Sequence, residues 1–334
     1  MSRDPARPTL LWPSSARVEY TNVPPAVEET FAHEFPELRI VVARSEEAFV
    51  QEIPEAEILV TARLKPEQFA LCRKLRWIHS PMAGVTALLF PAVVASPVVI
   101  TNGRTVHSVP VAEQTLALMF ALARRLPACF RFQSQRYWGQ DDSWLPETTP
   151  FELEGKTLGL VGLGAIGHEM VKRVRPLGMR VVAVKRNPSR GGEIVDRVYA
   201  PGQLHALLAE ADFVVLAAPD TAENFRLIST PELQRMKPTA YLINVARGTL
   251  VDTDALVKAL EAGAIAGAGL DVTDPEPLPP EHPLWGLPNA LITPHLGGAS
   301  DRFWERESAL LRDNLRRYLA AEPLFNIVDK QRGY

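Results

Sequence analysis

Three polar residues follow apolar segments in the second half of the chain. Arg247 comes directly after YLINVA, Glu276 follows GLDVTDP and His295 follows ALITP. Arginine carries a planar, permanent charge that orients a carboxylate, and histidine exchanges protons near neutral pH. A carboxylate beside the histidine would hold its ring in place. Singly, each residue suits a structural role or a surface charge. Together they suit hydride delivery to a 2-oxo acid, with arginine polarising the carbonyl group and histidine protonating its oxygen.

A glycine-rich segment upstream predicts the hydride carrier. The apolar stretch TLGLVG runs into a G-x-G-x-x-G turn and then into the helical segment HEMVKRVRPLG, and a second apolar stretch follows. This is the spacing of a dinucleotide-binding βαβ unit, in which the diphosphate lies on the helix N-terminus. The alternative, glycines that serve only a turn, explains less of this context. The predicted cofactor contacts are Gly162, Gly164, Ala165, Ile166 and Gly167.

The residues after the second strand of this unit predict which coenzyme binds. An acidic residue there would accept hydrogen bonds from the adenosine ribose, whereas a basic residue accommodates a 2′-phosphate. This chain has Lys185 and Arg186 at that position, with Arg190 close behind. We therefore expect NADP(H) in preference to NAD(H). The alternative is that these cations are ordinary solvated surface charges, and NAD(H) remains a possible coenzyme.

Composition and charge exclude several classes of protein. The chain has 334 residues, is 46% hydrophobic and 22% charged, and carries a formal net charge of -3. That balance gives no electrostatic reason to expect nucleic acid or an anionic membrane as a partner. The apolar run 115–123 ends at two arginines and is too short to span a membrane. The N-terminal residues lack the apolar run of a secretory signal, so a cytoplasmic protein is expected. Cys72 and Cys129 are too few for a zinc site, and no metal is predicted.

The elements that position these residues alternate along the chain. TLLW, RIVVA, EILVTA, LRWIHS and VVIT form one series of apolar segments, and a second series begins at TLGLVG. Helix-like segments separate them, which predicts an α/β fold with two doubly wound parallel sheets. At this length two domains are expected. Because the strands of a parallel sheet end at one edge, polar residues that follow different strands should gather there.

The motifs, taken in order, resemble those of the D-isomer-specific 2-hydroxyacid dehydrogenases over nearly the full length. The resemblance rests on GLVGLGAIG, LINVARGTLVDTDAL, AGLDVTDPEPLP and ITPHLGG. It implies that His295 is the general acid/base, Glu276 its partner and Arg247 the substrate anchor. It also implies that Asp271 receives the nicotinamide carboxamide. The turn from Pro219 to Thr221 is expected to line the dinucleotide.

The resemblance also implies a domain order. A Rossmann-type nucleotide domain, residues 108–296, would be inserted into a flavodoxin-like substrate domain formed by residues 1–107 and 297–334, with the active site in the cleft between them. In the substrate domain, backbone N–H groups of Ala83 and Gly84 are expected to hold the substrate carboxylate. Family members are usually homodimers. This chain departs from the common pattern at Thr86, where aspartate is usual, and at His107.

Among family members the chain is most similar to the NADP-using glyoxylate and hydroxypyruvate reductases. The expected activity is reduction of a small 2-oxo acid to the D-2-hydroxy acid. Alternatives are an NAD(H)-using member, a phosphite oxidiser on the same fold, or a dinucleotide-sensing binding protein without catalysis. Formate oxidation is disfavoured, because the resemblance implies glutamine in place of Glu276 in that branch.

Overall fold

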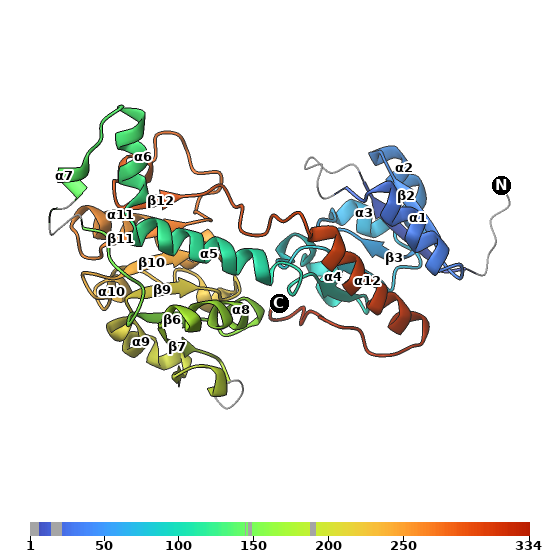
Figure 1. Ribbon diagram of the computed structural model, residues 1–334. Helices are drawn as coiled ribbons and strands as arrows, with labels where there is room; N and C mark the ends of the chain where they lie inside the picture. Colours follow the sequence, from blue (N-terminus) through green and yellow to red (C-terminus); the bar gives the residue numbers. More distant parts are fainter. Residues whose placement is uncertain (1–6, 15–21, 144, 146–148, 188–191) are drawn as a thin grey trace. The chain divides into compact units, whose positions relative to one another are not determined.

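The computed structural model describes residues 7–14, 22–143, 145, 149–187 and 192–334. It divides into two compact units. One, which we call the split unit, comprises residues 1–107 and 300–334; the other, the central unit, comprises residues 108–299. In Figure 1 the blue N-terminal elements and the red C-terminal helix belong to the split unit, and the green to orange elements belong to the central unit.

The split unit is built on a five-stranded parallel sheet with the strand order β2-β1-β3-β4-β5. This is a flavodoxin-like order. The strands are β1 (Thr9–Pro13), β2 (Arg39–Ala43), β3 (Ala56–Val60), β4 (Trp77–Ser80) and β5 (Val99–Asn102). The helices are α1 (Pro25–Glu34), α2 (Glu46–Glu52), α3 (Pro66–Leu71), α4 (Pro91–Ala95) and α12 (Phe303–Leu319).

Both faces of this sheet are covered, which is why its strands are mostly apolar. Successive residues of β1 point to opposite faces. Leu10 packs in a cluster with Phe31 of α1 and Leu311 of α12, whereas Leu11 packs in a cluster with Phe49 of α2. Helices from both ends of the chain therefore build a single layered unit.

The central unit contains a seven-stranded parallel sheet with the order β12-β11-β10-β9-β6-β7-β8. The strands are β6 (Thr157–Val161), β7 (Arg180–Val184), β8 (Arg197–Tyr199), β9 (Phe213–Leu216), β10 (Tyr241–Asn244), β11 (Gly267–Leu270) and β12 (Ala290–Ile292). The helices are α5 (Ser108–Ala123), α6 (Leu126–Ser134), α7 (Gln140–Ser143), α8 (Ala165–Val174), α9 (Leu204–Glu210), α10 (Thr230–Leu233) and α11 (Thr253–Glu261).

The chain winds outward from β6 in both directions, so the topological switch point of the central sheet lies between β6 and β9. Helices α5 and α8 contribute to the apolar cluster on one face, and α9, α10 and α11 to the cluster on the other (Figure 1). The predicted α/β class with two parallel sheets is confirmed. Strand β8 was not expected, because its three residues are too few to show a pattern. Within the described residues, no helix is long and apolar enough to cross a membrane.

Candidate active site

The candidate residues of the central unit gather at one edge of its sheet. The glycine-rich turn follows β6, Lys185 follows β7 and Pro219 follows β9. Arg247, Glu276 and His295 follow β10, β11 and β12, which are neighbours in the sheet. The carboxyl ends of parallel strands form the ligand-binding edge of such sheets.

The glycine-rich turn has the geometry that a diphosphate requires. Gly162 has a φ of 105°, and a Cβ there would lie 2.6 Å from the carbonyl oxygen of Ala217. Gly164 is the N-cap of α8, no side chain caps that end of the helix, and a Cβ on Gly164 would meet open space. The first N–H groups of α8, at Ala165 and Ile166, therefore face room for an anion. These residues fit a dinucleotide.

The adjoining edge of the site is positively charged, with one carboxylate beside it. Lys185 is half-buried and Arg186 is exposed. The Arg186 guanidinium lies 3.6 Å, Nη2 to Oε2, from Glu223 in the 3₁₀ turn Ala222–Asn224. Glu223 was not associated with this edge from the sequence. Arg190 lies outside the described residues.

The turn after β9 is fixed from both sides. Asn224 donates its side-chain N–H to the carbonyl of Pro219 at 2.8 Å, and Thr249 donates its hydroxyl to Asp220 at 2.9 Å. The Thr221 hydroxyl is buried and has no hydrogen-bond partner within the described part of the chain. The segment predicted to line the dinucleotide is thus a braced turn beside the switch point.

Arg247 is held on a turn by its neighbours. The buried Asn244 donates to the carbonyl of Arg247 at 2.8 Å and accepts from the N–H of Ala246 at 3.1 Å. A Cβ on Gly248 would lie 1.9 Å from the carbonyl oxygen of Thr273, so only glycine fits there. This close approach brings the Arg247 turn against the segment that leads to Glu276. Asn244 was not predicted from the sequence.

The structure brings His295 and Glu276 together. Their Nδ1 and Oε1 atoms are 2.7 Å apart, and the two side chains are 45% and 42% exposed. Because a carboxylate only accepts, the histidine donates from Nδ1, and Nε2 has no partner among the described residues. His295 has a φ of 54°, a backbone conformation that non-glycine residues adopt rarely. A histidine oriented by a carboxylate, with its second nitrogen available, is the arrangement of a general acid/base.

Asp271 anchors the segment that carries this histidine. Its carboxylate is buried and accepts from the Thr293 hydroxyl at 2.5 Å, from the N–H of Leu296 at 2.9 Å and from the N–H of Gly297 at 2.8 Å. The carbonyl of Asp271 accepts from the N–H of His295 at 2.9 Å. The resemblance assigned Asp271 to the nicotinamide, and the structure shows that it also fixes the His295 segment.

In the split unit, Ala83 and Gly84 lie on the loop after β4. The last residue of β5 and the loop after β5 hold this loop through three of its carbonyl groups. Asn102 donates its side-chain N–H to Ala83 at 2.7 Å, Gly103 donates its backbone N–H to Met82 at 3.1 Å, and His107 donates from Nε2 to Pro81 at 3.0 Å. His107, a departure from the family pattern, therefore has a structural partner on the loop that contains Ala83.

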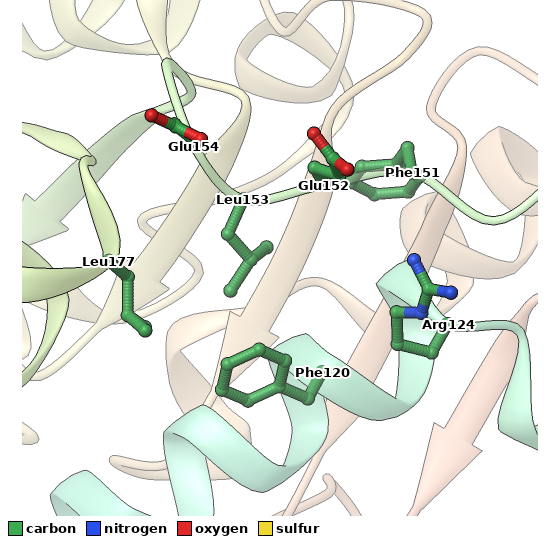
Figure 2. Close-up of a pocket in the computed structure, with 7 residues that line it drawn as sticks. All are labelled: Phe120, Arg124, Phe151, Glu152, Leu153, Glu154 and Leu177. Carbon is green, nitrogen blue, oxygen red and sulfur yellow. The ribbon is translucent and has the colours of Figure 1, made fainter.

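A hollow in the central unit lies apart from the candidate residues. Its volume is about 260 Å³. Figure 2 shows Phe120 of α5 and Arg124, which directly follows α5, facing the extended segment of residues 151–154, with Leu177 at one side. None of the predicted site residues lines it.

The central unit has a doubly wound sheet with a G-x-G-x-x-G turn at its switch point, and these features define the class of dinucleotide-binding proteins.

Comparison with known proteins identifies the family. The family described as D-isomer specific 2-hydroxyacid dehydrogenase, NAD binding domain, matches residues 116–297. The glyoxylate reductase of Thermofilum pendens is 36% identical over 274 residues, a match that covers 82% of this chain and 80% of that protein. This chain belongs to the D-isomer specific 2-hydroxyacid dehydrogenase family, an NAD(P)-dependent enzyme family.

Solved structures agree with this assignment. A D-isomer specific 2-hydroxyacid dehydrogenase family protein from Aeromonas salmonicida is 30% identical with a TM-score of 0.82, and the match covers 97% of this chain and 99% of that chain. A D-isomer specific 2-hydroxyacid dehydrogenase from Xanthobacter autotrophicus, solved with NADPH, is 28% identical with a TM-score of 0.82, over 98% of this chain and all of that chain. The family predicted from the sequence is confirmed.

Proposed function

We propose that this protein is an NADP(H)-preferring reductase that converts a small 2-oxo acid, such as glyoxylate or hydroxypyruvate, to the D-2-hydroxy acid. The observation that carries the proposal is the His295–Glu276 pair, 2.7 Å apart, at the same sheet edge as Arg247 and the glycine-rich turn. The glyoxylate reductase of Thermofilum pendens and the NADPH complex of the Xanthobacter autotrophicus enzyme support the substrate and the coenzyme.

The chemistry follows from the donors that this edge presents. When bound, the reduced nicotinamide supplies a hydride to the carbonyl carbon of the substrate. Arg247 binds the substrate carboxylate and polarises the carbonyl group. His295 donates the proton on Nε2 to the carbonyl oxygen, while Glu276 holds the Nδ1–H and stabilises the charged ring. Asp271 receives the nicotinamide carboxamide through its remaining acceptor capacity, since each carboxylate oxygen accepts more than one hydrogen bond.

Coenzyme choice rests on the charge after β7. A 2′-phosphate at this edge meets the basic side chains of Lys185 and Arg186. Gly162, Gly164, Ala165, Ile166 and Gly167 hold the diphosphate, and the turn from Pro219 to Thr221 lines the dinucleotide.

The substrate carboxylate also needs donors from the split unit. We assign the substrate domain to residues 1–107 and 297–334 and the dinucleotide domain to residues 108–296. Ala83 and Gly84 are half-buried on a loop whose carbonyl groups are tied down by the β5 loop. These hydrogen bonds hold the loop in place, and the N–H groups of Ala83 and Gly84 are the donors that it offers to an anion.

A homodimer is also part of the proposal. Large apolar side chains are exposed on and just after α5 and α6: Phe120 is 40% exposed, Leu126 38%, Phe130 60% and Trp138 85%. Exposed apolar patches of this kind mark protein interfaces. Light scattering of the native protein and of a Phe130→Asp variant tests this, and a monomeric native protein contradicts it.

The reaction is tested with NADPH and a panel of acids: glyoxylate, hydroxypyruvate, pyruvate, a branched 2-oxo acid and, in the oxidative direction with NADP, phosphite. Turnover with at least one 2-oxo acid is expected. The His295→Ala variant should lose on the order of 10² to 10⁴ in kcat while its Kd for NADPH stays unchanged. His33→Ala, an exposed histidine in the split unit, is the matched control.

Three outcomes contradict the proposal in different ways. NADPH binding without turnover of any 2-oxo acid indicates the dinucleotide sensor, and turnover of phosphite alone indicates the oxidiser. A loss of only a few-fold in His295→Ala removes this histidine from the acid/base role.

A further inference from the structure

The coenzyme edge contains an acid that the sequence did not reveal. Lys185 and Arg186 follow strand β7, so no carboxylate follows that strand directly. The structure supplies one from a different strand, because Glu223 lies on the turn after β9 and its Oε2 is 3.6 Å from Arg186 Nη2. Strands β7 and β9 flank β6, which ends in the glycine-rich turn. The two residues therefore follow strands on opposite sides of β6, and their side chains meet beside the predicted diphosphate site.

The backbone of the Glu223 turn is fixed by hydrogen bonds, whereas the Glu223 and Arg186 side chains are exposed. The Glu223 turn is fixed by the Asn224 hydrogen bonds to Pro219 and Thr221, at 2.8 and 2.9 Å. The Glu223 and Arg186 side chains, by contrast, are 82% and 49% exposed, and an exposed ion pair is worth only a fraction of a kcal/mol to about 1 kcal/mol. A bound coenzyme can therefore replace this pair with its own contacts.

We propose that Glu223 is the acidic half of a dual coenzyme site. With NAD(H), its carboxylate accepts a hydrogen bond from the adenosine ribose hydroxyls, the task that an acid after β7 performs elsewhere. With NADP(H), the 2′-phosphate takes Arg186, and Glu223 opposes the phosphate as a like charge. Glu223 thus sustains NAD(H) binding and limits the preference for NADP(H). This inference rests on the proposed function, which places the coenzyme at this edge.

The test compares Glu223→Ala and Glu223→Gln with the native protein. The Kd values for NADPH and NADH are measured by fluorescence titration at low salt. Both variants remove the charge, so the Kd for NADPH should fall about 2- to 5-fold, and this gain should shrink at high salt. Alanine also removes the acceptor, so the Kd for NADH should rise about 3- to 10-fold in Glu223→Ala and less in Glu223→Gln, whose amide oxygen still accepts.

Glu261→Gln is the matched control, because Glu261 is an exposed glutamate at the end of α11 in the same unit. It should leave both Kd values unchanged. An unchanged Kd for either coenzyme in Glu223→Ala, or a parallel change in both, overturns the assignment. Thermal melting checks that the variants fold.

The same titrations separate this inference from the proposed function. A native protein that binds NADH more tightly than NADPH contradicts the proposed preference, whatever Glu223 does. A native protein that prefers NADPH, with a ratio of Kd values that Glu223→Ala leaves unchanged, contradicts only the role of Glu223.

Discussion

Asp271→Asn tests how the segment that carries His295 is held. The native carboxylate is 2% exposed and accepts three hydrogen bonds: one from Thr293, one from Leu296 and one from Gly297. Asparagine keeps one acceptor oxygen and replaces the other with an NH₂ group. If the amide oxygen stays with Thr293 and Leu296, the NH₂ group faces the N–H of Gly297, and two donors meet without an acceptor.

The cost follows from the bond that is lost. A hydrogen bond to a charged group contributes about 1.5 to 3 kcal/mol, and a buried donor left unsatisfied costs about 1 to 3 kcal/mol. We therefore expect Asp271→Asn to destabilise this segment by about 2 kcal/mol, which corresponds to roughly a 30-fold increase in local opening. The backbone of His295 is affected as well, because its N–H donates to the carbonyl of Asp271.

Local opening of this segment is measured by amide hydrogen exchange, followed by mass spectrometry on a peptide that spans residues 293–299. Faster exchange by roughly 30-fold is expected at the N–H groups of Leu296 and Gly297, with kcat reduced and the exchange of the split unit unchanged. Asp254→Asn, an exposed aspartate in α11, is the control. Exchange in Asp271→Asn that matches the native protein would refute the role of these hydrogen bonds.

Three further predictions follow from contacts in the split unit and from the two cysteines. Burial raises the pKa of Cys72 to about 11, whereas Cys129 is exposed. Near pH 8, iodoacetamide should therefore alkylate Cys129 well before Cys72, and equal alkylation rates would contradict this. His79→Leu should lower the free energy of unfolding by about 3 to 5 kcal/mol, because it leaves the buried carboxylate of Glu307, whose Oε1 lies 2.9 Å from His79 Nε2, without its partner. An unchanged melting temperature would contradict this prediction. Asn102→Ala removes the donor to Ala83 and should raise KM for the 2-oxo acid more than it lowers kcat; a loss in kcat alone contradicts that role.

The sequence was sufficient for the fold where strands are buried on both faces. Runs such as RVVAV and the G-x-G-x-x-G turn predict a βαβ unit from local pattern alone, and β8 was missed because three residues carry too little pattern. Glu276 and His295 could be paired in advance because each lies on the segment that follows a strand of a parallel sheet, and such strands end at one edge.

The residues that support the site could not be found in this way. Asn244, Thr293 and Asn102 act through hydrogen bonds to loops, and polar residues of these types occur throughout the chain. Glu223 reaches Arg186 only because β9 and β7 lie on either side of β6, which depends on the strand order of the finished sheet. Contacts between loops from different strands are set by tertiary structure and leave no local signal.

The most direct test of the proposed NADP(H)-preferring 2-oxo acid reductase is the ratio of kcat/KM for NADPH to that for NADH, measured with glyoxylate at saturating concentration. A ratio well above one is predicted from Lys185 and Arg186, which follow β7. A ratio below one would contradict the coenzyme assignment, and absence of turnover with either coenzyme would contradict glyoxylate reduction itself.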